Sequence, residues 1–242
     1  MIVWNWLRYC KIEEALALQE ELFLKKLEGD TRNYLLFTEH FPAYSCDETH
    51  YSEELWRKPR DPKIPLHMVR RGGSINFHGP GQLLCYCIFN LSQLGIDGIP
   101  GINAAIDGVI KLFLHEHEVR GRRRSKPVQA QGIWVIGRDH KMRKIASRGL
   151  SIRQGITRFG FALNIHTNLL FYDYIYPCGL DIEMTSVFKE TAKINEQGKI
   201  VDPGKFLVLP GVAQDLAPYF QEVLGVPIER DIEVQLPPLA PA

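Results

Sequence analysis

Short apolar runs of strand length dominate the sequence, and only three longer stretches repeat their apolar residues with helical spacing. The strand-length runs are residues 2–7, expected at a sheet edge, and 34–37, 66–69, 83–91, 132–136, 143–152 and 160–165. The helical stretches are residues 12–28, 101–119 and about 211–224. Runs of strands, interrupted by an early, a central and a late helix, predict an α+β fold rather than a regular βαβ alternation.

The chain has 242 residues, enough for one hydrophobic core, and no linker divides it convincingly. We therefore expect a single domain over residues 1–235, with polar loops at 47–65 and 190–204. Residues 236–242 contain three prolines and are expected to form an extended or flexible tail.

Charge and cysteine content exclude several classes of protein. The formal net charge is +1, whereas a nucleic-acid-binding domain is usually strongly basic. The N-terminus lacks the pattern of a secretory signal, and no run approaches the roughly 20 apolar residues of a membrane helix. These features predict a cytoplasmic protein with no membrane or nucleic-acid partner. An odd number of cysteines, five, does not predict a disulfide framework.

The densest functional signal is segment 70–82, which holds four glycines, a proline, two arginines and a histidine. Glycines let a backbone approach a ligand closely, and Arg71 and His78 offer donors to a carbonyl or a phosphate. A tight hairpin without a ligand is the alternative interpretation. The segment has neither the Gly-Lys-Ser/Thr of a Walker loop nor the strand–GxGxxG–helix context of a dinucleotide site.

A second candidate segment begins at Lys144. Strand alternation would place Lys144 and Ala146 on one face and Ile145 on the other. A lysine followed by small residues suits the wall of a cavity, because small side chains leave room for a ligand. The alternative is a solvated lysine on an edge strand.

The third candidate is Cys178, which lies between Pro177 and Gly179 and is therefore expected in a turn. The thiolate is the reactive form of cysteine, and a nearby ammonium group would stabilise it. A buried cysteine that acts only as an apolar residue is the alternative.

Weaker candidates do not predict a metal site. Cys85 and Cys87 share a strand face without a second pair at metal-ligand spacing, which favours core packing over zinc. His115 and His117 do not face each other on a helix. A basic run comprises Arg120, Arg122, Arg123, Arg124 and Lys126. Such a run is typical of a solvated loop; the alternative is a contact with an acidic carrier protein.

Together these segments resemble the lipoyl(octanoyl) transferase family, from the first helix to about Ser186. Each motif alone is weak, but five in order are specific. They are Glu39-His40-Phe41-Pro42; Arg71 to Gln82; Gly132-Ile133-Trp134-Val135 with Lys144-Ile145-Ala146; Gly160-Phe161-Ala162-Leu163-Asn164; and Pro177-Cys178-Gly179.

The resemblance implies the fold of the biotin and lipoate ligase catalytic domain, a mixed sheet flanked by helices. It also implies an acyltransferase of lipoate biosynthesis that needs no cofactor. The donor would be octanoyl-acyl carrier protein. The acceptor would be a lysine of a lipoyl domain, on the E2 subunit of a 2-oxoacid dehydrogenase or on the glycine-cleavage H protein.

The resemblance further implies roles for individual residues. Cys178 would be the nucleophile that forms an acyl-thioester, and Lys144 would stabilise its thiolate. The residues around the acyl chain would be Arg71, Gly72, Gly73, Ser74, Ile75, Asn76, Phe77, His78, Ser147, Arg148, Gly149, Gly160, Phe161 and Ala162.

Five positions depart from the family's pattern without removing the cysteine–lysine pair. Phe159 stands where a histidine is frequent, and Arg148 occupies a commonly apolar position. These departures bear on the details of the pocket and on the preferred acyl length. The other three are Asp47 for glycine, Cys87 for proline and Phe77 for tyrosine.

One thioester exchange followed by amide formation defines the expected mechanism. Covalent catalysis splits one difficult transfer into two easier steps. Backbone N–H groups near Cys178 or in the glycine-rich turn would stabilise the oxyanion. Lys144 would deprotonate the acceptor lysine, with His78 as the competing base.

Three rival functions stay open at this point. One is an ATP-dependent lipoate or biotin ligase of the same fold, and another is a catalytically silent paralogue that binds carrier or lipoyl proteins. The third is a cysteine hydrolase that pairs Cys178 with His78 or His166.

Overall fold

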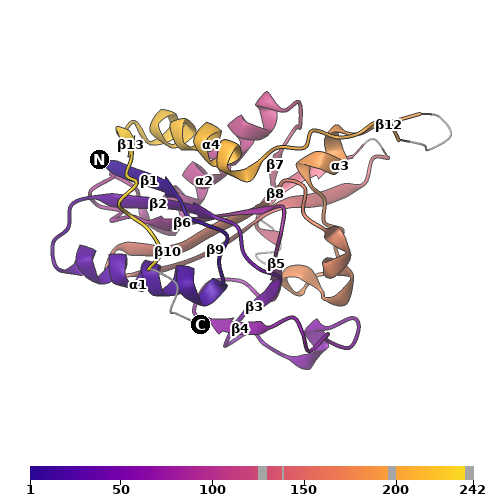
Figure 1. Cartoon of the computed structure of the whole chain (residues 1–242), viewed down its shortest axis with the longest axis horizontal. Helices are drawn as coiled ribbons and strands as arrows, with labels where there is room; N and C mark the ends of the chain where they lie inside the picture. The colour runs from indigo at the N-terminus through magenta and orange to yellow at the C-terminus, as the bar shows by residue number, and fades with distance from the viewer. Residues whose placement is uncertain (125–129, 138, 196–199, 238–242) are drawn as a thin grey trace.

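A large mixed β-sheet forms the centre of the computed structural model, which describes residues 1–124, 130–137, 139–195 and 200–237 (Figure 1). Its strand order is β13-β1-β2-β6-β10-β9-β8-β7. The strands β13, β1 and β2 are parallel, and all other neighbours are antiparallel. The bounds are β1 (Ile2–Trp6), β2 (Asn33–Thr38), β6 (Gln82–Ile88), β7 (Arg122–Arg124), β8 (Gly132–Ile136), β9 (Met142–Arg153), β10 (Ile156–Asn164) and β13 (Ile228–Arg230).

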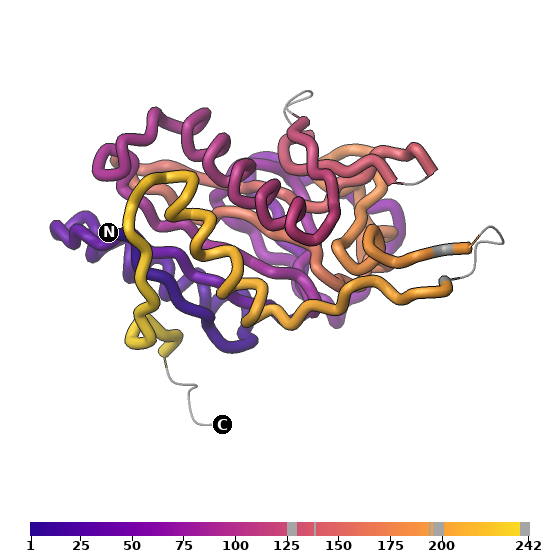
Figure 2. The backbone as a smooth tube through the Cα atoms, turned by 90° about the horizontal axis from the view of Figure 1, so that it is seen from above, coloured from indigo at the N-terminus to yellow at the C-terminus, as the bar shows by residue number. Residues whose placement is uncertain are grey.

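Helices cover both faces of this sheet. Helix α1 (Ile12–Leu27) lies on one face, and α2 (Gly98–Glu116) and α4 (Leu209–Leu224) lie side by side on the other (Figures 1 and 2). The first turn of α1 is capped by the Glu14 carboxylate, which accepts a hydrogen bond from the Lys11 N–H. Each helix buries its apolar stripe, so two separate hydrophobic clusters lie on the two faces of the sheet.

A smaller sheet of order β4-β3-β5 lies beside the large one, on the α1 side (Figure 1). Its strands are β3 (Ala43–Asp47), β4 (Leu66–Val69) and β5 (Asn76–His78). A third cluster, with Tyr44, Ile75 and Phe77 at its centre, joins it to two 3-10 turns. The remaining elements are the 3-10 turns Glu53–Leu55, Leu169–Tyr174 and Pro177–Gly179, with α3 (Val187–Thr191), β11 (Lys193–Ile194) and β12 (Ile200–Asp202).

The structure confirms the predicted α+β class, the three helices and the long central strands. The prediction that residues 2–7 form an edge strand is wrong, because β13 pairs with β1 on its outer side. The segment 190–204 is not simply a loop, since β11 and β12 pair within it. Lys126, residues 196–199 and the tail residues 238–242 lie outside the described residues, and the single-domain organisation stays a prediction.

No helix in the described part of the chain combines the length and the apolar character needed to cross a lipid bilayer.

Candidate active site

Cys178 lies in an unusual backbone conformation within a single 3-10 turn. Its φ of 59° and ψ of 21° place it in the left-handed region, which residues other than glycine rarely adopt. The Cys178 N–H donates to the Ile75 carbonyl over 2.9 Å, and the Gly179 N–H donates to the Tyr176 carbonyl over 2.7 Å. Backbone strain of this kind tends to occur at functional sites, where the surroundings hold it in place.

The amine of Lys144 contacts the sulfur of Cys178. The Nζ–Sγ distance is 3.1 Å, and the Lys144 side chain is completely buried. The Trp134 ring lies 6.0 Å from Nζ, so the amine has an aromatic face as well as the sulfur beside it. Buried polar groups need hydrogen-bond partners, and the sulfur of Cys178 is the partner of this amine.

A β-bulge in β9 turns Lys144 toward this site. On the neighbouring strand, Ile133 pairs with Ala146 and Trp134 pairs with Lys144, which leaves Ile145 as an extra residue. Ile145 and Ala146 consequently both pack into the cluster under α2 and α4, and Lys144 points away from it. The prediction that Lys144 and Ala146 share a face is therefore wrong, because it assumed unbroken alternation.

A second cation, the half-buried Arg71, lies at the same site. Its guanidinium donates to the Ser45 carbonyl (3.0 Å), the Ser45 hydroxyl (2.8 Å) and the Ser74 carbonyl (3.1 Å). Burial lowers the pKa of Arg71, and the charge of Cys178 opposes that shift. Because an arginine remains protonated in proteins, the site holds a permanent positive charge beside the sulfur.

The hydrogen bonds of His78 fix its tautomer. Gln82 uses its Nε2 to donate to the Phe77 carbonyl (3.1 Å) and to Asn164 Oδ1 (2.9 Å), so its Oε1 accepts from His78 Nδ1 over 2.8 Å. His78 Nε2 then accepts from the Ser45 hydroxyl over 2.9 Å. Burial, assisted by the charge of Arg71, lowers the pKa of His78 to about 3. His78 is thus neutral at physiological pH, with both ring nitrogens engaged.

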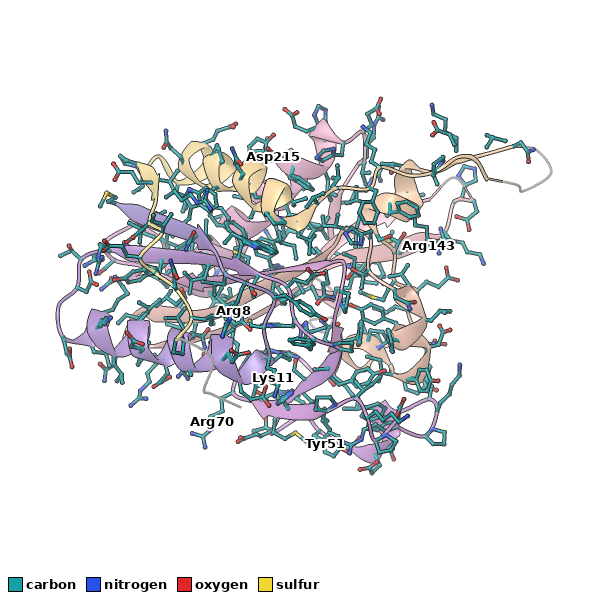
Figure 3. The ribbon with its side chains drawn as sticks, in the orientation of Figure 1. Arg8, Lys11, Tyr51, Arg70, Arg143 and Asp215 are labelled. Carbon is teal, nitrogen blue, oxygen red and sulfur yellow. The ribbon has the colours of Figure 1, made fainter. Side chains whose placement is uncertain are left out.

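A pocket with about 620 Å³ of empty space, part of it open to solvent, adjoins Cys178 on the α1 side of the large sheet. Figure 3 labels Lys11, before α1, and Arg70, after β4, on this side of the large sheet, and Asp215 of α4 on the opposite side. The predicted site residues that line it are Arg71, Gly73, Ser74, Asn76, His78, Ser147, Arg148, Gly149, Gly160, Phe161, Ala162 and Cys178.

Four predicted residues do not line the pocket. Ile75 and Phe77 are fully buried in the cluster of the small sheet, because residues on β5 alternate between the two faces. The Gly72 N–H instead donates to the Leu150 carbonyl over 2.9 Å, which ties the glycine-rich segment to β9. Lys144 lies behind Cys178.

Eight residues that line the pocket were not among the predicted site residues, although Phe159 was noted as a departure that bears on the pocket. They come from α1, β3, β4 and β6 and from the start of β10, so their proximity depends on the tertiary fold. The available signal was the apolar face of the first helix, which gave no indication of a ligand. The missed residues are Ile12, Leu16, Ser45, Val69, Leu84, Cys85, Tyr86 and Phe159.

Among the polar side chains that line the pocket, Asn76 and Ser147 are buried with unused hydrogen-bonding capacity. Asn76 Oδ1 and Ser147 Oγ have no hydrogen-bond partner among the described residues. Buried polar atoms without partners are rare in folded proteins. A bound polar group would satisfy them.

The charge of Arg148, one of the departures noted above, is neutralised by the carboxylate of Asp107 on α2. Its Nε lies 2.8 Å from Asp107 Oδ1, and the two side chains are 2% and 4% exposed. Arg123 of β7 contacts the other oxygen of Asp107 at 3.2 Å. The basic run around Arg123 is thus an exposed edge strand rather than the expected loop.

Comparison with known proteins gives a consistent match. The model of the lipoyl protein ligase A/B catalytic domain matches residues 11–200. The chain is 30% identical over 194 residues to an octanoyltransferase of Dictyoglomus thermophilum, covering 78% of each. It is 30% identical over 206 residues to an octanoyltransferase of Bacteroides fragilis, covering 81% of this chain and 90% of the relative.

Solved structures show the same fold at lower identity. A lipoate-protein ligase A bound with ATP superposes with a TM-score of 0.72 at 17% identity, over 98% of this chain and 89% of the other. A putative lipoate protein ligase from Thermoplasma acidophilum gives 0.70 at 16% identity with the same coverage. The fold is therefore that of the lipoate ligase catalytic domain, as the sequence predicted.

Proposed function

The chain belongs to the family of lipoyl protein ligase A/B catalytic domains, and we propose that it transfers an octanoyl group through a thioester on Cys178. Its octanoyltransferase relatives make it an acyltransferase. The donor in this proposal is octanoyl-acyl carrier protein, and the acceptor is a lysine of a lipoyl domain, on an E2 subunit or on the glycine-cleavage H protein. The 3.1 Å contact between Lys144 Nζ and Cys178 Sγ, at the wall of a pocket, is the observation that carries the proposal.

In the first half-reaction the Cys178 thiolate attacks the carbonyl carbon of the donor thioester. The new carbon–sulfur bond forms as the bond to the carrier sulfur breaks, and the Lys144 ammonium gives its proton to the departing thiolate. Lys144 is then neutral beside the acyl-enzyme. Covalent catalysis of this kind replaces one difficult transfer by two easier ones.

In the second half-reaction the acceptor amine attacks the acyl-enzyme and loses a proton to neutral Lys144. The amide forms, the Cys178 thiolate leaves, and the thiolate–ammonium pair is restored. We assign this base to Lys144 rather than to His78, because His78 Nε2 already accepts from Ser45 and its pKa is about 3.

Stabilisation of the oxyanion requires donors that are not already used. The N–H groups of Cys178 and Gly179 donate to backbone carbonyls, which argues against the expected role of these two groups. We assign the role to the Ser147 hydroxyl, a buried donor that lines the pocket and has no partner among the described residues.

An ATP-free transfer assay tests the proposal against the ligase alternative. The protein, octanoyl-acyl carrier protein and a lipoyl domain are mixed without nucleotide and with a chelator, and the mass of the lipoyl domain is followed. Octanoylation should proceed, and Cys178→Ser should abolish it. Cys10→Ser is the matched control, since Cys10 is also buried but lies beside Thr38 and His40, away from the pocket. A requirement for ATP would identify a ligase instead.

A further inference from the structure

The side chain of Phe159 lies on the unexpected face of β10. Residues two apart on a regular strand share a face, and Phe161 packs into the cluster under α2 and α4. Phe159 packs instead against the cluster under α1, and it lines the pocket. Its φ of 61° explains the difference, because this left-handed residue interrupts the alternation just before Gly160.

The surroundings hold this interruption in place. The side-chain oxygen of Gln19, a buried residue of α1, accepts a hydrogen bond from the Phe159 N–H. Nearby, the Thr157 hydroxyl donates to the Cys87 carbonyl over 2.6 Å and accepts from the Phe89 N–H over 3.0 Å. Three backbone groups around the interruption, the Phe159 N–H, the Phe89 N–H and the Cys87 carbonyl, thus have side-chain partners that stabilise it.

The pairing of β9 and β10 gives the position of Phe159 along the pocket. Counting away from Lys144, Ser147 pairs with Ala162, then Gly149 with Gly160, then Leu150 with Phe159. Three residues of strand from Ala162 to Phe159 span about 10 Å. The pocket therefore has a floor of small residues that begins near the catalytic pair and ends at a phenyl ring.

Gly149 and Gly160 cannot carry side chains on this floor. A Cβ at Gly160 would lie 2.1 Å from the Cys85 carbonyl oxygen, and one at Gly149 would lie 2.8 Å from Arg71 Cδ. Because glycine has no side chain, neither position narrows the pocket that both residues line. The first large side chain along β10 beyond them is that of Phe159.

We propose that Phe159 closes the far end of the acyl pocket and sets the longest chain that the enzyme accepts. This inference rests on the proposed function, because it assumes that an acyl chain on Cys178 occupies the pocket. The chain extends over Ala162 and Gly160, and its terminal carbons meet the phenyl ring. Gln19 is a positioning residue that fixes the ring through the backbone.

Acylation of the enzyme by carrier proteins charged with six- to twelve-carbon chains tests this role. The rate of mass gain is measured for the wild type, Phe159→Ala and Phe159→Gly, the latter being free of strain at a positive φ. In the wild type the rate should fall beyond the preferred length. In both variants each methylene admitted beyond that length should raise the relative rate about fourfold, the equivalent of roughly 0.8 kcal/mol.

Gln154→Gly is the matched control, since Gln154 also has a positive φ, of 51°, but is exposed and does not line the pocket. It should leave the length profile unchanged. A wild-type profile in both Phe159 variants, with octanoylation of Cys178 intact, would overturn the role of Phe159. Failure of the wild type to gain any acyl mass would instead overturn the proposed function.

Discussion

Two cations and one sulfur define the chemistry at the scale of single residues. Lys144 is fully buried, and the half-buried Arg71 donates to the carbonyls of Ser45 and Ser74, so both cations are withdrawn in part from solvent. Such charges are costly unless an anion lies close by. In the proposed mechanism the thiolate of Cys178 is that anion, and a thiolate is the form of cysteine that attacks thioesters.

The buried histidines His40 and His78 predict an acid-sensitive fold. Burial lowers the pKa of His40 to about 4 and that of His78 to about 3, whereas a histidine in the unfolded chain titrates near 6.5. Between these values the unfolded state binds more protons than the folded state. The free energy of unfolding should therefore fall as the pH drops below about 6.5, by up to about 1.4 kcal/mol per pH unit for each histidine.

Urea titrations at intervals from pH 7.5 to 4.5 measure this slope. His40→Leu should reduce it whatever the variant does to stability at neutral pH. His50→Leu is the control, because its side chain is 61% exposed, and it should retain the wild-type slope. An unchanged slope in His40→Leu would show that His40 does not contribute to the acid sensitivity.

At the scale of elements, three departures from regular backbone geometry position the site. The bulge at Ile145 directs Lys144, the left-handed turn presents Cys178, and the left-handed Phe159 directs its ring. A periodicity argument cannot predict such irregularities, because it assumes a constant period along each strand. The assumption of a constant period also explains why Ala146 was wrongly expected to share a face with Lys144.

Gly132 supports the bulge, and we predict that Gly132→Ala disrupts it. Its φ is 138°, and a Cβ there would lie 2.3 Å from the Ala146 carbonyl oxygen and 2.8 Å from Lys144 Cε. Backbone strain and overpacking together should cost about 3 kcal/mol or more of unfolding free energy, with loss of acylation. Chemical denaturation and the acylation rate measure the two effects.

Gly29→Ala is the control that distinguishes the effect of backbone strain from the effect of the steric clash at Gly132. Gly29 also has a positive φ, of 107°, but no described atom lies within 4 Å of its added Cβ. It should lose only about 1–2 kcal/mol and retain activity. Equal losses in the two variants would mean that the contact with Lys144 and Ala146 is unimportant.

Short and charged strands were the elements that the sequence did not reveal. β13 and β7 have three residues each, and charged side chains dominate them, so hydrophobic periodicity gives no signal. The long strands β9 and β10 and the helices were predictable because their apolar spacing extends over many residues. Missing β13 is what placed β1 wrongly at the edge.

At the scale of the whole molecule, the pocket is assembled from both sheets and α1. Ile12 and Leu16 reach it from the first helix, and Val69 reaches it from the small sheet. Local motifs identified the glycine-rich segment, the lysine and the cysteine, because those residue types are chemically distinctive. In the sequence, the apolar residues that line the pocket cannot be distinguished from ordinary core residues. Only the three-dimensional arrangement identifies them.

We propose that Cys178 carries the acyl group and that Lys144 keeps its sulfur ionised. Both roles are tested by measuring the intact mass of the protein over time with octanoyl-acyl carrier protein and no acceptor. The wild type should gain one octanoyl mass on the peptide that contains Cys178, and Cys178→Ser should gain none. Lys144→Met should react about a hundredfold more slowly at neutral pH and recover as the pH rises. Octanoylation of Lys144→Met at the wild-type rate, or of Cys178→Ser at any comparable rate, would contradict the account.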